Sequence, residues 1–209
     1  MYNCTHCALQ GCSKGDLQKS LPNCPSKEKS IQDEAQKLYL EAENHKIAYN
    51  AALVEAEGYG KKTRIEEIIS FAKKCEYKKI GLVFCMGLIN EAKQFQNILA
   101  YHEFEVISVL CKNVGHKKDD IGIKDEDKIQ GDCDEIMCNP IGQALLLNQQ
   151  NTDFNIILGL CVGHDTLVMK YLKAPMTTLA VKDRVTGHNP LAAIYLADGY
   201  YKKKLYGKK

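Results

Sequence analysis

The sequence has no apolar run that approaches the ~20 residues of a membrane-spanning helix. Its first residues, MYNCTHCALQGC, also lack the apolar core of a secretory signal. We therefore expect a cytoplasmic protein without a membrane partner. Because structural disulfides are rare in a reducing compartment, the ten cysteines of the chain predict metal or thiol chemistry instead.

An excess of charge of one sign is also missing. The 28 Lys and Arg residues nearly balance the 26 Asp and Glu residues, which gives a formal net charge of +2. No basic stripe is interleaved with aromatic residues, and the lysines near the C-terminus are typical of a solvated tail. These observations predict that the protein does not bind nucleic acid.

Several phosphate-binding and catalytic motifs are absent as well. No G-x-G-x-x-G follows the first apolar strand, and the chain contains no G-x-x-x-x-G-K-[ST], so a dinucleotide or P-loop site would lack its phosphate cradle. The G-x-S-x-G signal of α/β-hydrolases is missing too. The sequence therefore favours neither a nucleotide-dependent enzyme nor a serine hydrolase.

Cysteine is what the sequence has in abundance, and four cysteines lie within the first 24 residues. They are Cys4, Cys7, Cys12 and Cys24, spaced C-x2-C-x4-C-x11-C. Four thiolates complete either a tetrahedral zinc site or an iron–sulfur cluster, and both remain open here. Residues 1–25 are poor in apolar side chains, so metal binding would have to supply their folding energy. The alternative is four unligated cysteines in a loose terminus.

The remainder, residues 26–209, predicts a single α/β domain. Residues 26–76 have helical periodicity, with one helix that is capped by Ser30 and ends at Gly58, and a second helix capped by Thr63. Apolar strands then alternate with helices, which predicts a four-stranded parallel, doubly wound sheet of the Rossmann or flavodoxin type. The strands are expected at 80–87, 104–112, 154–163 and 176–183, and the helices at 88–102, 140–150, 166–172 and 190–205.

The expected strand order locates the chemistry. Right-handed crossovers favour the order 2-1-3-4, in which strands 80–87 and 154–163 are neighbours. The chain leaves these two strands in opposite directions, so their carboxyl ends form the switch point at which open α/β sheets bind ligands. The charged stretch 113–132 has no clear period and is expected to be a surface loop or a cover.

Three cysteines are expected at this edge of the sheet. Cys85 and Cys161 end two neighbouring strands, and Cys138 precedes a helix within the string MCNP. Together they could bind a cluster with one open iron or a catalytic metal, and Cys85 and Cys161 are candidate catalytic thiols. The alternative is that each is a small buried residue at a strand end. Cys111 and Cys133 lie nearby without a defined position.

Polar residues gather at the same edge and predict a small anionic ligand. Lys182 and Arg184 follow the last strand, and helix N-termini attract anions. His164 and His188 are candidate proton donors or metal ligands. The predicted N-cap residues are Asn139, Asp165 and Asn189. The alternative is that these side chains only cap helices and satisfy local structure.

With both cysteine regions in view, the sequence resembles an uncharacterised family of small metal-binding proteins, a domain of unknown function with four N-terminal cysteines. The resemblance rests on the strings CTHCALQGC with Cys24-Pro25, MCNP, GLCVGHD and KDRVTGHNP. It implies a metal site at the four N-terminal cysteines, and it implies no reaction.

Two hypotheses about function follow from the sequence. The first is an enzyme that carries out iron–sulfur redox or sulfur-transfer chemistry on a small anion at the strand-end cysteines. The second is a binding or sensing module, in which the N-terminal cysteines hold a structural zinc and the pocket binds an anion without turnover.

Overall fold

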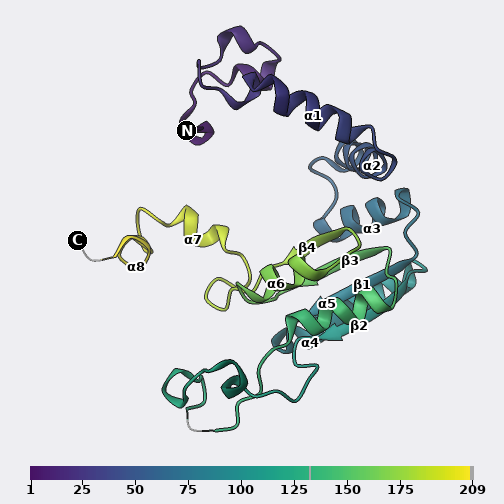
Figure 1. Cartoon of the computed structure of the whole chain (residues 1–209), viewed down its shortest axis with the longest axis vertical. Coiled ribbons are helices and arrows are strands. Elements are labelled where there is room, and N and C mark those ends of the chain that lie inside the picture. Colours follow the sequence, from purple (N-terminus) through teal and green to yellow (C-terminus); the bar gives the residue numbers. More distant parts are fainter. Residues whose placement is uncertain (132, 208–209) are drawn as a thin grey trace. The chain divides into compact units, whose positions relative to one another are not determined.

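The computed structural model describes residues 1–131 and 133–207 (Figure 1). The chain forms two compact units, Met1–Gly60 and Lys61–Lys209. In this division residues 26–60 belong with the cysteine segment, and the parallel sheet lies in the second unit. Among the described residues, no helix combines the length and the apolar character needed to cross a bilayer.

The first unit begins with short turns and continues into two helices. Within residues 1–25 the buried residues are Gly11 and Ser20, so this segment has almost no core of its own. The turns are 3-10 helices at Cys4–His6, Gly11–Lys14, Leu17–Lys19 and Pro25–Lys27, and the helices are α1 (Lys29–Tyr39) and α2 (Ala42–Gly58).

The prediction of one continuous helix from an N-cap at Ser30 is wrong. Ser30 lies inside α1, and the chain turns at Leu40 and Glu41 before α2 begins. The side chain of Asn44 stabilises this turn, because its Nδ2 donates to the carbonyl of Leu38 at 3.0 Å. That bond satisfies one of the carbonyl groups that the end of α1 leaves without a helical partner.

The second unit opens with α3 (Arg64–Lys74), and here the predicted cap is confirmed. Thr63 and Glu66 form a capping box in which each side chain accepts a hydrogen bond from the other's backbone N–H. The other helices are α4 (Ile89–Tyr101), α5 (Pro140–Gln149), α6 (His164–Tyr171), α7 (Leu191–Tyr195) and α8 (Lys202–Tyr206). The predicted single helix 190–205 is therefore wrong, because the chain turns around Gly199 between α7 and α8.

Four strands form one parallel sheet in the order β2-β1-β3-β4, as predicted. They are β1 (Lys79–Phe84), β2 (Glu105–Leu110), β3 (Phe154–Leu158) and β4 (Met176–Ala180). Ile80 of β1 pairs with Val106 of β2 and with Phe154 of β3, so these strands run side by side in register. Their carboxyl ends consequently meet at one edge of the sheet.

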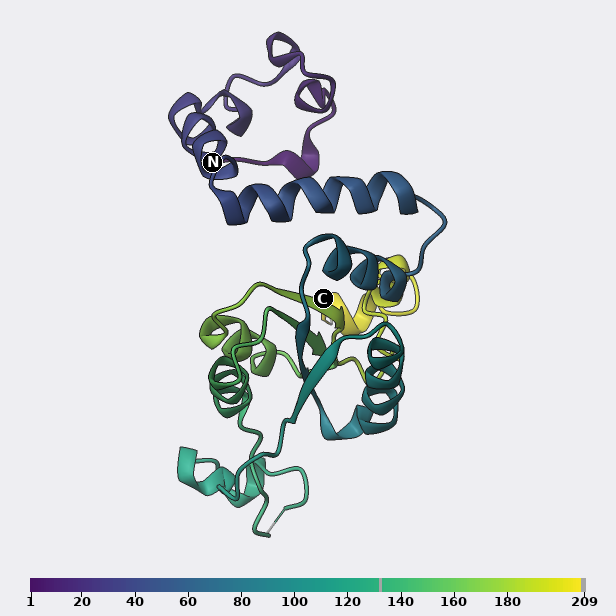
Figure 2. The same ribbon diagram turned by 90° about the vertical axis from the view of Figure 1, so that its right-hand side faces the viewer.

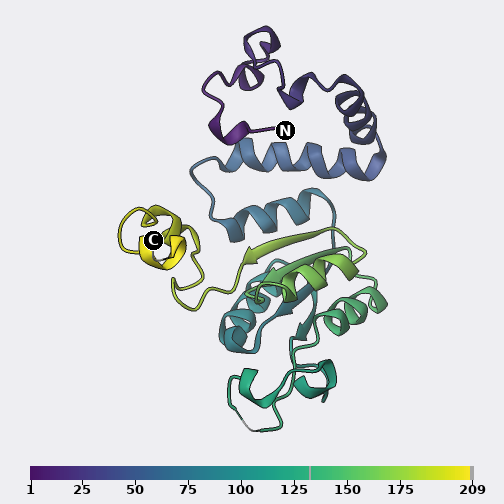
Figure 3. The same ribbon diagram turned by 60° about the vertical axis from the view of Figure 1, so that its left-hand side comes forward.

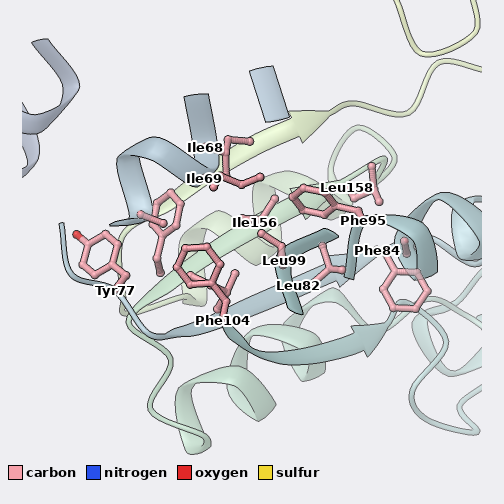
Figure 4. Packing of buried hydrophobic residues seen from close by; sticks show 14 of the residues in the cluster. Ile68, Ile69, Tyr77, Leu82, Phe84, Phe95, Leu99, Phe104, Ile156 and Leu158 are labelled. Atoms are coloured by element: carbon pink, nitrogen blue, oxygen red, sulfur yellow. The ribbon is translucent and has the colours of Figure 1, made fainter. Parts of the chain in front are cut away.

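Alternate residues of β1 face two separate hydrophobic clusters. Leu82 and Phe84 pack with α3 and α4, whereas Val83 packs with α5 and α6. Figure 2 shows α4 (teal) and the pair α5 and α6 (green) on opposite sides of the strands, and Figure 4 shows Phe95 and Leu99 against the first cluster. The central strands are therefore buried on both faces, which explains their nearly continuous apolar sequences.

The charged segment between β2 and α5, residues 112–137, has an internal structure (Figure 3). It contains two 3-10 turns, Lys118–Ile121 and Asp125–Asp127. The side chain of Lys128 is only 2% exposed and forms ion pairs with Asp119, at 2.9 Å, and with Asp125. Lys118 pairs with the buried Glu135 at 2.6 Å. This segment is thus held by a few buried charges rather than by an apolar core.

Candidate functional site

Three neighbouring strands are followed by cysteines at the same edge of the sheet. Cys111 comes directly after β2 and Cys85 directly after β1, while Cys161 lies three residues beyond β3. Backbone bonds continue the ladder beyond the strands: Cys111 N donates to Phe84 O at 2.9 Å, and Cys85 N donates to Leu158 O at 3.3 Å. The sheet itself therefore brings these thiols together.

A fourth cysteine reaches the same edge from the far end of segment 112–137. Cys138 lies just before α5, and the next residue, Asn139, donates its backbone N–H to Cys111 O at 2.7 Å. The side chain of Asn139 caps α5 by accepting from Gly142 N at 3.0 Å, as the sequence predicts. It also donates to Asn113 Oδ1 at 2.9 Å. These bonds join the two ends of the segment in a narrow neck.

All four cysteines line one pocket with a volume of about 540 Å³. The strand ends form one wall of this pocket and segment 112–137 forms another. Its apolar lining includes Met86, Ile121, Ile123, Ile129, Ile136, Met137, Ile141 and Leu167. A concave, mainly apolar site with a few polar groups is typical of small-molecule binding.

The pKa values of the neighbouring thiols Cys111 and Cys138 are shifted in opposite directions. Hydrogen bonding from the Cys138 thiol lowers the pKa of Cys111 to about 5, although partial burial opposes this shift. Two further donors act in the same direction, the backbone N–H of Met86 at 3.3 Å and the thiol of Cys85. The pKa of Cys138 is raised, because its proton is held in the hydrogen bond to Cys111 and because the thiol is partly buried. Cys111 is consequently the thiolate of the pair.

The cationic side of the pocket lies at Cys161. Arg184 Nη2 donates to Cys161 Sγ at 3.4 Å, and Lys182 is held in place by a backbone bond from its N–H to Leu160 O at 3.0 Å. The ammonium of Lys182 lies against the backbone at Gly87, where a side chain would crowd it. No described carboxylate forms an ion pair with Lys182 or Arg184, so both charges are available to a ligand.

Comparison with known proteins relates this chain to a family and to a relative whose functions are both unknown. The profile of a family described as "Protein of unknown function (DUF1847)" matches residues 24–179. The chain belongs to this family. It is also 51% identical over 203 residues to the uncharacterized protein MJ0455 of Methanocaldococcus jannaschii, and the match covers 97% of each chain. The expected resemblance to a domain of unknown function is confirmed, whereas the metal binding that it implied stays a prediction.

The DUF1847 match contains the thiols of the pocket and leaves out other candidate residues. Cys85, Cys111, Cys138 and Cys161 all lie between residues 24 and 179. Three of the four N-terminal cysteines precede the match, and Lys182 and Arg184 follow it. The family region thus coincides with the thiol side of the pocket.

The pocket of this DUF1847 protein includes only some of the polar residues predicted from sequence. Asn139, His164, Lys182 and Arg184 line it. Among the described residues, the lining does not include Asp165, His188 or Asn189.

Local structure explains why these three residues lie elsewhere. His188 accepts from Asp183 N at 3.0 Å and stabilises its own loop. Asp165 lies in the first turn of α6, where it accepts from Thr166 N at 2.8 Å, and α7 begins after Pro190 without a side-chain cap. The predictions that Asp165 and Asn189 are N-caps are wrong.

Cys111 is the site residue that sequence reasoning left undefined. Its signal was present, because the string FEVISVLCK places a cysteine directly after an apolar strand, as VFC does for Cys85. Cys133, the other undefined cysteine, lies within segment 112–137, where its thiol donates to Gln130 Oε1 at 3.6 Å.

Neither cysteine group has the geometry of a metal centre in this structure. Within residues 1–131 and 133–207, no three His, Cys, Asp or Glu side chains are grouped so that they could hold one metal ion. Two of the pocket sulfurs accept hydrogen bonds from nitrogen, Cys111 from the Met86 N–H and Cys161 from Arg184. The donor types suit zinc or iron.

Proposed function

We propose that this protein binds a small anion in the strand-end pocket and takes a sulfur atom from it onto Cys161. The observation that carries the proposal is the contact between Cys161 Sγ and Arg184 Nη2, at 3.4 Å, in a pocket that also contains Lys182. Cys161 is half-buried and lines the pocket, so its thiol is open to a ligand.

The charges of the pocket favour an anion. Four Lys and Arg side chains are among the described residues that line the pocket; of these, Lys118 is paired with Glu135 at 2.6 Å, and Lys112 donates to Ile136 O at 2.7 Å. Lys182 and Arg184 remain for the ligand. The Arg184 guanidinium lies beside the Cys161 sulfur, which is the nucleophile of the proposed reaction.

The reaction balances with an anion that carries a transferable sulfur, such as thiosulfate. The Cys161 thiolate attacks the outer sulfur of thiosulfate, the sulfur–sulfur bond breaks, and sulfite leaves with the electron pair of that bond. A persulfide remains on Cys161, and an acceptor thiol can take up its outer sulfur. Arg184 and Lys182 hold the anion and offset the negative charge of the departing sulfite.

The test is the reaction of the purified protein with thiosulfate. We expect sulfite release and a mass increase of one sulfur atom on the peptide that contains Cys161, and neither in Cys161→Ser. Arg184→Ala should lower the rate about 10- to 100-fold, since a hydrogen bond to a charged group contributes roughly 1.5–3 kcal/mol. Lys170→Ala, on the far part of α6, is the matched control and should react like wild type. Binding of thiosulfate without sulfite release would instead support the binding module.

The binding of zinc or an iron–sulfur cluster by the N-terminal cysteines stays a separate prediction. Its support is the C-x2-C-x4-C-x11-C spacing in a segment with two buried residues. In addition, hydrogen bonds from Ser26 lower the pKa of the Cys24 thiol and so favour the thiolate that a metal requires.

Metal analysis of protein purified without oxygen tests this prediction. We expect about one zinc ion or one cluster per chain, lost in Cys4→Ala and retained in Cys133→Ala. Metal that survives Cys4→Ala and is lost in Cys85→Ala would place it at the pocket and contradict the prediction.

A further inference from the structure

Cys111 and Cys138 flank the neck of segment 112–137, and the structure holds them together by more than their side chains. The backbone N–H of Asn139 donates to Cys111 O at 2.7 Å. Asn113 Nδ2 donates to Asn139 O at 3.1 Å, and Asn139 Nδ2 returns a bond to Asn113 Oδ1 at 2.9 Å. The main chains beside the two cysteines are thus positioned by three hydrogen bonds.

The two thiols lie beside each other across this neck, because the largest influence on the pKa of each is the other. The thiol of Cys138 donates a hydrogen bond to the sulfur of Cys111, and the backbone N–H of Met86 donates to the same sulfur at 3.3 Å. Both cysteines line the pocket, where Cys138 is half-buried and Cys111 is almost fully buried. An attacking sulfur, a second thiol beside it and a cavity for a reagent therefore lie at one place.

We propose that Cys111 and Cys138 form a dithiol that is oxidised reversibly to a disulfide by exchange with a small anionic disulfide in the pocket. The proposal shares the anion-binding pocket of the proposed function, but it does not depend on sulfur transfer at Cys161. Its oxidant is a low-molecular-weight disulfide, RSSR, in which R carries a negative charge that Lys182 and Arg184 can attract.

The exchange takes place in two steps. The Cys111 thiolate attacks one sulfur of RSSR, the sulfur–sulfur bond breaks, and RS⁻ leaves, so that a mixed disulfide joins Cys111 to SR. Cys138 then loses its proton and attacks the sulfur of Cys111, and the second RS⁻ leaves and takes up that proton as RSH. Two electrons pass from the protein sulfurs to RSSR, and the product is a disulfide that ties the neck of the segment.

The protonation states of the two thiols support Cys111 as the attacking cysteine and Cys138 as the second one. A thiolate that accepts several hydrogen bonds attacks disulfides at a lower pH than an ordinary thiol does. The second cysteine stays protonated until the mixed disulfide has formed, which keeps the pair reduced in the absence of a reagent. Cys85 is the nearest competitor, but its backbone is bonded to Leu158 at the end of β3, outside the neck that positions Cys138 beside Cys111.

The experiment exposes the full-length reduced protein to dithiodiglycolate, a small anionic disulfide, followed by acid quenching, alkylation and peptide mapping. We expect a Cys111–Cys138 disulfide that dithiothreitol reverses. Cys138→Ser should stop at a mixed disulfide on Cys111, and Cys111→Ser should leave Cys138 unmodified. Cys133→Ser, a cysteine of the same segment, is the matched control and should behave like wild type. Far-ultraviolet circular dichroism checks that each variant is folded.

Two results would overturn the proposal. One is a disulfide that joins other pocket cysteines, such as Cys85 with Cys111. The other is persistence of free Cys111 and Cys138 after the exposed N-terminal thiols have reacted. The outcome is separable from the proposed function, because Cys161→Ser abolishes sulfur transfer from thiosulfate but should still form the Cys111–Cys138 disulfide.

Discussion

Replacement of Gly159 by alanine is expected to destabilise the protein by about 2–5 kcal/mol, the sum of backbone strain and overpacking. Gly159 follows β3 with a φ of 65°, which non-glycine residues rarely adopt. A Cβ at this position would also lie 1.9 Å from Leu88 Cδ1, a buried core atom. The loop that carries Cys161 begins here, so the same change should reduce sulfur transfer.

Gly163 provides the matched control for this substitution. Its φ is 87°, but a Cβ there would meet nothing within 4 Å, so Gly163→Ala measures strain without a clash. Urea unfolding of both variants separates the two effects. The free energy of unfolding of Gly159→Ala should be lower than that of Gly163→Ala by about 1–3 kcal/mol. If both variants lose the same free energy of unfolding, then Leu88 moves aside at little cost, and packing at this position is looser than the structure indicates.

The thiolate of Cys111 should persist to a much lower pH than an ordinary thiolate. With a pKa of about 5, this group is almost fully ionised at about pH 6.5, where an ordinary thiol is only about 1% ionised. Titration of the ultraviolet thiolate absorbance under a phosphine reductant should therefore show one early transition near pH 5. That transition should be missing from Cys111→Ser.

The variants of Cys138 test the cause of this shift. Cys138→Ser retains a hydroxyl donor and should keep the transition low, whereas Cys138→Ala removes the donor and should raise the pKa of Cys111. If the two variants titrate alike, then the hydrogen bond from Cys138 does not cause the shift, and the Met86 N–H and the Cys85 thiol become its main causes.

The same pair predicts how stability changes with pH. The folded pKa of Cys111 lies below its unfolded value of about 8.5, so its contribution is complete above that pH and is lost as pH falls towards about 5. Cys138 acts in the opposite sense, because its folded pKa is raised and its contribution is lost as pH rises above about 8.5. Unfolding measurements from pH 5 to pH 10 should therefore show a flatter profile in a variant with both cysteines replaced by serine.

The sheet could be predicted from the sequence because its physical causes are local. Apolar runs such as IGLVF and FNIIL are what strands buried on both faces require, and the handedness of crossovers restricts the order in which they pair. The helix boundaries could not be predicted from the sequence as well as the strands. The turn at Leu40 and Glu41 contains no glycine or proline, and it is stabilised by Asn44, whose contact with Leu38 no periodicity reveals.

The site was predictable where it follows the strands and not where it depends on loops. Cys85, Cys161, Lys182 and Arg184 line the pocket because each lies just beyond a strand. His188 and Asn189 also follow β4, but at a greater distance along the chain, and the loop before them folds around the side chain of Asp183, which accepts from Thr186 N at 3.0 Å. Such a turn depends on side-chain geometry that a residue pattern does not contain.

The neck formed by Asn113 and Asn139 makes segment 112–137 a self-contained insertion. Its two ends already meet at the sheet, so each doubling of its length costs only about 0.6 kcal/mol in chain entropy. Evolution can therefore exchange or resize this segment without disturbing the strands. Related proteins can acquire pockets of different size and preference over the same row of cysteines, much as antibodies vary their loops on a constant framework.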